Sequence, residues 1–274
     1  MIIPSLQFLI ILLLWPETAS AQAPALLQNC TSKCGDVTIP FPFGIGYDCS
    51  IDLWFAIECK RNKPYLRNID LEVLDISLDG TMRVSYSVYN TCDRNKSLEN
   101  TAYLESTPFI FSQTRNKFIG VGCGKFFFMS YDDSPIAQCT TTCDNNNKTQ
   151  ENIYCQDAVV STLKRYDPYF EDLKTACNYA VLVEQQWLDD NLKNPLDIKN
   201  FTHVPVVLEW SVFRLSFETM VKNKSKSIYQ SSSTCEISAC SCFSNNFPTV
   251  RCNCIHGFEG NPYLLEGCRG INFE

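Results

Sequence analysis

Alternating apolar and polar residues predict β-strands in the first half of the chain. Residues 82–88 carry apolar side chains at every second position, and residues 69–73 do the same before the pattern slips at Leu74. Asp79-Gly80 separates the two runs and is a strong signal for a tight hairpin turn. The pattern therefore predicts a β-hairpin, and the slip predicts a β-bulge in its first strand.

A second pair of apolar runs follows the same logic. Residues 108–111 and 118–121 flank the polar loop Ser-Gln-Thr-Arg-Asn-Lys and predict another hairpin. Residues 30–143 are therefore interpreted as one β-rich domain.

The pattern changes in the middle of the chain. The polar, apolar-poor stretch 140–151 predicts a boundary. Beyond it, residues 152–220 form a mixed middle region, with an amphipathic stretch at 158–165 and strand-like runs at 177–183 and 204–210.

The last part of the chain is rich in cysteine. Residues 221–234 are rich in Lys and Ser and predict a linker. Six cysteines then fall between Cys235 and Cys268, which is too short a segment to build a core without crosslinks. The predicted fold class is mainly β and disulfide-rich: a cysteine-stapled N-terminal domain, the mixed middle region and a small module at 235–268.

The N-terminus has the character of a secretory signal. An apolar run at 6–15 is followed by small residues, and it is too short to span a bilayer core of about 30 Å. We therefore expect residues 1–21 to be a signal peptide that is removed on secretion. No later run reaches the length of a transmembrane helix, because Glu209 and Arg214 interrupt residues 204–217.

All 16 cysteines follow the predicted signal, and an exported chain would pair an even number of them as disulfides. Zinc is the main alternative use of cysteine, but the two histidines, His203 and His256, lie in no zinc-binding frame. We expect no metal and no cofactor. Outside the last module, the cysteines expected in disulfides are Cys30, Cys34, Cys49, Cys59, Cys92, Cys123, Cys139, Cys143, Cys155 and Cys177.

Sequons for N-glycosylation agree with export. They occur at five positions spread along the chain: Asn29, Asn95, Asn147, Asn200 and Asn223. The net charge of −7 argues against nucleic acid as a partner.

Several motifs together resemble one plant family. The sequence has Cys34-Gly35, then Ile39-Pro-Phe-Pro-Phe-Gly44 and Cys49, and later the run 258–264 ahead of Gly267-Cys268. This arrangement is similar to the extracellular half of plant wall-associated receptor kinases, whose galacturonan-binding domain opens with CGN-x-x-IPYPFG. Asp36 replaces the usual Asn and Phe41 the usual Tyr. Further matching landmarks are Val121-Gly-Cys123, Cys139 with Cys143, and residues 204–210.

The last module resembles an EGF-like domain, through Cys252-x-Cys254-x-x-Gly257-Phe258 and a distant cysteine. That resemblance implies three disulfides, namely Cys235–Cys242, Cys240–Cys252 and Cys254–Cys268. Calcium-binding members carry an acidic residue just before the first cysteine. Ser-Ser-Ser-Thr stands there instead, so no calcium site is expected.

The family's ligand is pectic polygalacturonate, so the resemblance directs attention to cations that could hold carboxylates. Lys60, Arg61 and Lys63, with Arg67 nearby, form the densest basic cluster of the first domain. Residues 30–143 nevertheless hold 11 Lys/Arg against 13 Asp/Glu, so a solvated charged face is the competing interpretation. Aromatic side chains that could stack on sugar rings are Trp54, Tyr65, Phe41 and Phe43, although for the last two a place in the core below a turn is the favoured interpretation.

Enzyme functions find little support in the sequence. No kinase motif is present, and Gly120–Lys125 lacks the spacing of a phosphate-binding loop. Acidic pairs such as Glu171/Asp172 or Asp189/Asp190 are too common in this chain to indicate a glycosidase.

The first hypothesis is therefore a secreted, cell-wall protein that binds pectin or oligogalacturonides without catalysis. Contact with a membrane is expected only for a longer form. An extracellular protein-interaction module without sugar binding is the alternative, and an enzyme that acts on wall polysaccharide is a third.

Overall fold

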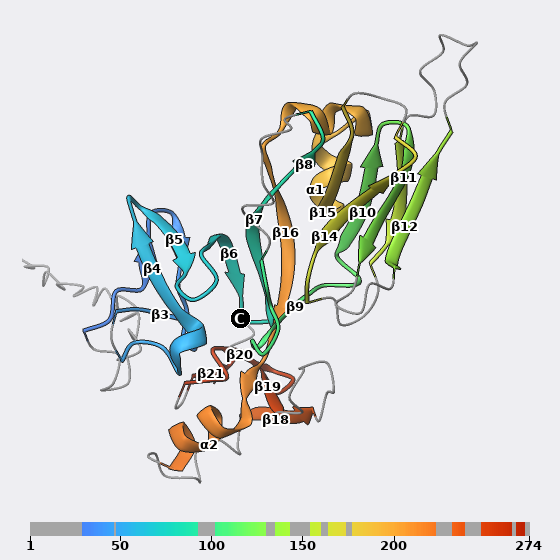
Figure 1. Ribbon diagram of the computed structural model, residues 1–274. Helices are drawn as coiled ribbons and strands as arrows, with labels where there is room; N and C mark the ends of the chain where they lie inside the picture. The colour runs from blue at the N-terminus through green and yellow to red at the C-terminus, as the bar shows by residue number, and fades with distance from the viewer. Residues whose placement is uncertain are drawn as a thin grey trace, which may run out of the picture.

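The computed structural model describes residues 29–46, 48–92, 102–129, 135–142, 154–159, 164–173, 177–222, 232–238, 248–264 and 267–271. Strands dominate the described part of the chain, and Figure 1 shows them in three groups. A long sheet runs through the centre, a pair of smaller sheets lies at one end of it, and the C-terminal segment lies at the other end.

The long sheet has seven strands in the order β3-β4-β5-β6-β7-β16-β9. Only β3 and β4 pair in parallel, and the other neighbours are antiparallel. The strands are β3 (Gly44–Ile45), β4 (Ala56–Lys60), β5 (Lys63–Leu66), β6 (Leu71–Ser77), β7 (Thr81–Ser87), β9 (Phe109–Phe111) and β16 (His203–Trp210).

Two smaller sheets pack against each other. One has the order β13-β10-β15-β8 and the other β12-β11-β14. The rings of Phe118 and Phe128, one from each sheet, lie 4.0 Å apart, and a side chain at Gly120 would collide with the ring of Phe126. The strands are β8 (Tyr89–Asn90), β10 (Asn116–Val121), β11 (Gly124–Met129), β12 (Pro135–Thr141), β13 (Tyr154–Ala158), β14 (Asp167–Glu171) and β15 (Tyr179–Glu184).

The remaining strands form small sheets at the two ends of the chain. β1 pairs with β2 at the N-terminal end, and the C-terminal segment contains the sheet β17-β19-β18 and the pair β20-β21. Their bounds are β1 (Lys33–Cys34), β2 (Val37–Thr38), β17 (Val212–Phe213), β18 (Ser233–Ser238), β19 (Thr249–Cys254), β20 (Phe258–Gly260) and β21 (Cys268–Gly270).

Helices are short in the described residues. The α-helices are α1 (Gln185–Asn191) and α2 (Arg214–Lys222), and 3-10 helices occupy Leu53–Phe55 and Pro195–Asn200. The strong β character expected from the sequence is thus confirmed, and the strand-like runs at 177–183 and 204–210 correspond to β15 and β16.

The first predicted hairpin is confirmed. β6 and β7 pair in antiparallel register around the turn at Gly80, whose φ of 89° is costly for any residue with a side chain. The register shifts between Val73 and Asp75, at the predicted bulge. Both features depend on local sequence, which is why the pattern was sufficient to find them.

The second predicted hairpin is wrong. β9 pairs with β16, whereas β10 pairs with β13 and β15, so the two strands lie in different sheets. The chain changes sheet at Asn116, whose buried amide donates to the carbonyl oxygens of Ser112 (2.9 Å) and Val207 (2.7 Å). Four consecutive residues of β10, 118–121, are buried, because the sheet is covered on both faces: Phe118 packs into one core cluster and Ile119 into the other.

The predicted boundary at 140–151 does not separate the sheets. β16 completes the long sheet begun by β3–β7, and β13 and β15 flank β10 in the adjoining sheet. Strands on both sides of the boundary therefore share sheets.

Two other predicted segments are only partly described. Of the predicted amphipathic stretch 158–165, Ala158 belongs to strand β13. Of the predicted linker, Val221 and Lys222 lie in α2, Ser233 and Thr234 lie in β18, and residues 223–231 lie outside the described residues.

One aromatic cluster connects the first segment to the C-terminal one. Phe43 contacts Phe55 (4.8 Å between ring centroids) and Trp210 (5.2 Å), and Trp210 in turn contacts Tyr263 (5.5 Å). The side-chain amide of Asn261 donates to the carbonyl oxygen of Phe41 at 2.6 Å. The C-terminal segment thus packs on the long sheet, below it in the view of Figure 1.

Disulfides occur throughout, and none of the described cysteines is free. The structure joins Cys30 to Cys49, Cys34 to Cys59, Cys92 to Cys177, Cys139 to Cys155, Cys235 to Cys252 and Cys254 to Cys268. Cys123 is also in a disulfide.

The C-terminal pairing corrects two of the three disulfides implied by the EGF-like resemblance. Cys254–Cys268 is present, but Cys235 pairs with Cys252, which excludes Cys235–Cys242 and Cys240–Cys252. The reason is the register of β18 and β19, which sets Cys235 directly opposite Cys252 with their Cα atoms 4.0 Å apart. Cys143, Cys240 and Cys242 lie outside the described residues.

Candidate functional site

The predicted basic cluster lies on the hairpin of β4 and β5. Arg61 and Asn62 form its two-residue turn, with φ of 52° and 62°, as in the tight turns whose twist matches paired strands. Lys60 and Lys63 are therefore opposite each other, and Glu58 is opposite Tyr65 on the same outward face. The Cys34–Cys59 disulfide ties this hairpin to the N-terminal segment.

Both lysines of the cluster are engaged by carboxylates. Lys60 Nζ lies 3.2 Å from Glu58 Oε2 and 3.0 Å from Asp70 Oδ1, and Lys63 Nζ lies 2.9 Å from Glu72 Oε1. The hydrogen bond to Asp70, helped by the one to Glu58, raises the pKa of Lys60 above its usual value. The hydrogen bond to Glu72 does the same for the pKa of Lys63.

The two arginines of the cluster are available to a ligand. Arg61 and Arg67 are exposed, and neither forms an ion pair with any residue that the structure describes. A guanidinium presents a planar set of donors that matches a carboxylate. The structure thus divides the predicted cluster into two engaged lysines and two unengaged arginines.

The predicted aromatic residues occupy different environments. Tyr65 is half-buried, and Lys60 Nζ lies over its ring at 5.2 Å from the centroid. Trp54 is partly buried in the 3-10 helix Leu53–Phe55, where its backbone N–H donates to Asp52 Oδ1 at 2.9 Å. Phe41 is also partly buried against the core.

Phe43 is corrected as a ligand-binding candidate. Its side chain is 1% exposed and fills the core among Phe55, Phe109 and Trp210. A ring without an exposed face cannot stack on a sugar. The alternative interpretation, that this aromatic plugs the core beneath the turn, is therefore the correct one for Phe43.

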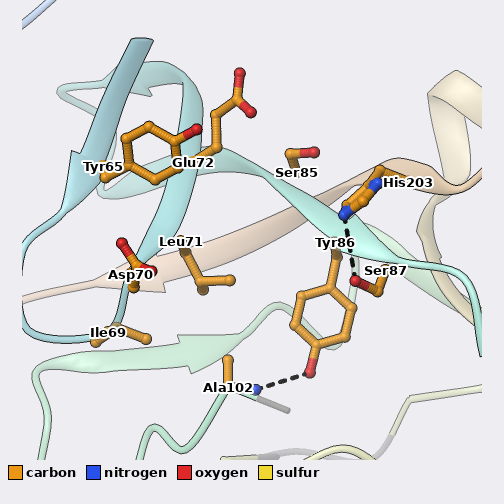
Figure 2. Close-up of a pocket in the computed structure, with 10 residues that line it drawn as sticks. All are labelled: Tyr65, Ile69, Asp70, Leu71, Glu72, Ser85, Tyr86, Ser87, Ala102 and His203. Carbon is orange, nitrogen blue, oxygen red and sulfur yellow. Dashed lines mark hydrogen bonds between the residues drawn. The ribbon is translucent and has the colours of Figure 1, made fainter. Parts of the chain in front are cut away.

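A groove of about 470 Å³ opens beside the basic hairpin. Its lining comes from β5, β6, β7 and β16 and from the segments beside them, as Figure 2 shows: Tyr65, Ile69, Asp70, Leu71, Glu72, Ser85, Tyr86, Ser87, Ala102 and His203. Tyr65 and Asp70 belong both to this groove and to the network around Lys60.

Hydroxyl and imidazole groups form one end of the groove. Ser87 Oγ lies 3.3 Å from His203 Nε2, and His203 Nδ1 lies 3.2 Å from Thr202 Oγ1. Below them, the Tyr86 hydroxyl accepts a hydrogen bond from the backbone N–H of Ala102 at 3.3 Å, and burial raises the pKa of Tyr86 well above its usual value (Figure 2). Tyr86 is thus a neutral group at the pH of living tissue.

The groove suits recognition better than catalysis. A Ser-His catalytic pair depends on a carboxylate that orients the histidine, and the described partner of His203 Nδ1 is a threonine hydroxyl. The carboxylates of Asp70 and Glu72 lie on the same side of the groove as the Tyr65 ring, and the hydroxyl and imidazole groups of Ser85, Ser87 and His203 lie on the other side (Figure 2). Such groups bind sugar hydroxyls and sugar ring faces.

The described residues hold neither a metal-binding group of side chains nor a membrane-spanning helix. They contain no group of three or more His, Cys, Asp or Glu side chains placed to hold a metal ion. Within the same ranges, no helix has both the length and the apolar character needed to cross a bilayer.

Sequence reasoning missed the residues that adjoin the cluster: Asp70, Glu72, Ser85, Ser87 and His203. Ser85 and Ser87 were detectable, because they occupy the polar positions of the alternating run 82–88. The proximity of Ser85 and Ser87 to Tyr65 was not detectable, because it depends on β6 lying between β5 and β7 in the sheet.

The predicted glycosylation sequons are described only in part. Asn29 and Asn200 are exposed, and Asn95, Asn147 and Asn223 lie outside the described residues.

One comparison with known proteins matches the N-terminal part of the chain to a family. Residues 30–86 match the family described as wall-associated receptor kinase galacturonan-binding, and this range contains the whole basic hairpin. No solved structure matches the chain.

Curated relatives match over most of the chain. Wall-associated receptor kinase 5 of Arabidopsis thaliana is 30% identical over 273 residues, which covers 89% of this chain and 35% of that protein. Wall-associated receptor kinase 1 of the same plant is 29% identical over 267 residues, with the same coverage of 89% and 35%. The chain thus spans about a third of the length of these relatives. Over most of its own length the chain is therefore similar to part of the wall-associated receptor kinases, and its residues 30–86 match the galacturonan-binding segment described for that family.

Proposed function

We propose that this protein binds galacturonan chains of pectin noncovalently, through the outward face of the β4–β5 hairpin and the adjoining groove. The observation that carries the proposal is the pair of unengaged guanidiniums, Arg61 and Arg67, inside the segment that matches the galacturonan-binding family. Each can form paired hydrogen bonds to a uronate carboxylate. The lysines are a second source of charge once a ligand displaces their internal partners.

The groove gives the proposed site its sugar-binding part. A uronate unit held by an arginine at the hairpin would place a neighbouring ring beside Tyr65, with its hydroxyls facing Ser85 and Ser87. Aromatic rings accept the apolar C–H faces of sugars, and serine hydroxyls both donate and accept hydrogen bonds. The same face therefore offers contacts for charge, for ring faces and for hydroxyl groups.

The setting in which this binding occurs is part of the proposal. Export, glycosylation at exposed sequons such as Asn29 and Asn200, and residence in the cell wall are consistent with the disulfide-rich fold. In this view the protein acts by binding and not by catalysis, and the curated relatives are receptor kinases by name.

The experiment that tests the proposal is calorimetric titration with a defined oligogalacturonide. We expect binding that weakens steeply with salt, because exposed ion pairs are screened over about 8–10 Å. The double variant R61A/R67A should lose about two- to thirtyfold in affinity, the sum of two exposed charge contacts.

A matched control removes two exposed cations far from the hairpin, Lys193 and Arg269. The control variant K193A/R269A loses the same charge and reports the effect of net charge alone. The proposal is rejected if the wild-type protein does not bind the oligomer, or if the two double variants lose the same affinity.

A further inference from the structure

Lys60 covers the one aromatic side chain shared by the basic hairpin and the groove. Its ammonium group lies 5.2 Å above the ring of Tyr65, in contact with Glu58 at 3.2 Å and with Asp70 at 3.0 Å. Glu58, Lys60 and Tyr65 lie on the outward face of the hairpin, and the charged groups of Lys60, Glu58 and Asp70 are exposed to water. The two carboxylates thus hold a cation on the surface on which a sugar ring would stack.

The contacts that Lys60 makes to Glu58 and Asp70 are of the same kind as those it could make to a uronate ligand. A carboxylate oxygen near 3 Å from the ammonium is what a uronate unit would supply. Exposed ion pairs contribute little to stability, so a ligand carboxylate can replace an internal one at small energetic cost. A neutral or methyl-esterified sugar has no group that can make this exchange.

We propose that Glu58 and Asp70 hold Lys60 as a cover on Tyr65, and that a uronate carboxylate removes the cover by taking the ammonium group for itself. Acidic sugars would then gain both the cation and the ring face, whereas neutral sugars would meet a blocked ring. Asp70 is in this sense a specificity-determining residue of the site. The inference rests on the proposed function, because it assumes that the hairpin face is where the galacturonan binds.

The first test needs no ligand. Hydroxyl-radical footprinting, read by mass spectrometry of the peptide that contains Tyr65, measures how exposed its ring is. Asp70→Asn weakens the hold on Lys60 and suits the backbone at this position, since φ is 55° and asparagine tolerates the left-handed region. We expect more modification of Tyr65 in this variant than in the wild type.

Asp75→Asn is the matched control. Asp75 is an exposed carboxylate of β6 in the same sheet, and among the described residues it makes no contact with Lys60. It removes the same charge and leaves the cover in place, so Tyr65 should be modified as in the wild type. Equal modification of Tyr65 in D70N and D75N overturns the inference.

The second test measures affinity for two oligomers of equal length, one fully acidic and one fully methyl-esterified. D70N should bind the acidic oligomer about two- to fivefold more tightly than D75N does, the size of one exposed ion pair. Lys60→Ala should bind the acidic oligomer less tightly and the esterified one more tightly than the wild type, because the charge is lost and the ring is open.

The outcomes separate the two proposals. Equal affinities of D70N and D75N for the acidic oligomer, or an unchanged or lower affinity of K60A for the esterified one, overturn the cover while leaving galacturonan binding intact. Failure of the wild type and of every variant to bind the acidic oligomer rejects the proposed function itself, and footprinting still decides whether Lys60 covers Tyr65.

Discussion

The protein uses aromatic side chains in opposite ways in two regions of the long sheet. Near its contact with the C-terminal segment, Phe43, Trp210 and Tyr263 are fully buried and pack edge to face or tilted in one cluster. On the outward face of the β4–β5 hairpin, Tyr65 is half-buried and lies under the charge of Lys60. The first region joins two parts of the chain, and the second holds a ring at the surface under a lysine.

This difference shows what the proline- and glycine-rich motif at 39–44 does. Its Phe43 anchors the aromatic cluster, and the carbonyl oxygen of its Phe41 accepts the amide of Asn261 from the run 258–264. The two motifs that most resemble the receptor kinase family are thus in contact with each other. Both motifs build the joint between the two segments, whereas the contacts proposed for the ligand lie on the β4–β5 hairpin.

The largest expected effect comes from breaking the buried region. Phe43→Ala should reduce the free energy of unfolding by about 3–5 kcal/mol, the range for removing a large aromatic side chain from a packed core. Denaturant unfolding with the disulfides intact measures it. Phe43→Leu keeps most of the volume and should cost less than half as much, so equal losses for the two variants would contradict the packing role.

The next largest effect is expected in the pH dependence of the unfolding free energy, and it follows from a contrast between two lysines in opposite environments. Lys60 on the face has its pKa raised by carboxylates, whereas Lys164 is 8% exposed and donates to the carbonyl oxygens of Leu104 (3.0 Å) and Thr107 (2.7 Å). Burial lowers the pKa of Lys164 from 10.5 to about 8. Between these values the unfolded chain binds more protons at this residue than the folded chain, so stability rises with pH.

The free energy of unfolding should therefore increase between about pH 8 and pH 10, with Lys164 contributing on the order of 2 kcal/mol. The dependence should be smaller by that amount in Lys164→Met, which cannot titrate. A variant with the same pH dependence as the wild type would show that Lys164 titrates alike in both states. Denaturant unfolding at a series of pH values makes the comparison.

These two regions also differ in how far the sequence could predict them. The hairpin of β6 and β7 followed from an alternating pattern and a turn, both local signals, and the hairpin with Lys60 and Lys63 appeared as a dense basic cluster. The partners of β9 and β10 could not be found in this way. β9 pairs with β16, which lies far along the chain, and no local pattern encodes that choice.

The candidate site shows the same limit. Charge and aromatic content identified Lys60 and Tyr65, but Asp70, Ser85 and His203 meet them only through the order of strands in the sheet. For Phe43, which stands between Pro42 and Gly44, the sequence favoured a place in the core but did not exclude an exposed ring. Long-range pairing decided both outcomes, and it is set by packing of the whole chain.

A smaller effect tests the contact between the two motifs. Asn261→Ala removes the hydrogen bond to the Phe41 carbonyl oxygen (2.6 Å) and the one from the backbone N–H of Tyr263 (2.9 Å). We expect a loss of about 1–2 kcal/mol in unfolding free energy. Asn68→Ala is the matched control, since its amide donates to the Leu53 carbonyl oxygen at an exposed position and should cost less. Equal losses of unfolding free energy in the two variants would show that the contact between the 39–44 and 258–264 motifs stabilises the fold no more than an exposed hydrogen bond does.

The smallest effect on stability, and the sharpest contrast with Phe43, is expected at Tyr65. Tyr65→Ala removes a half-buried ring from the outward face and should change the unfolding free energy by no more than about 1 kcal/mol. Its affinity for an acidic oligogalacturonide should nevertheless fall about three- to tenfold, since an aromatic contact contributes roughly 0.5–1.5 kcal/mol. Tyr65→Phe keeps the ring and should retain most of the affinity.

Calorimetry and denaturant unfolding on the same preparations measure the affinity and the unfolding free energy. A Tyr65→Ala variant that is unstable yet binds normally would reverse the assignment, because Tyr65 would then support the fold and the exposed ring would have no part in binding.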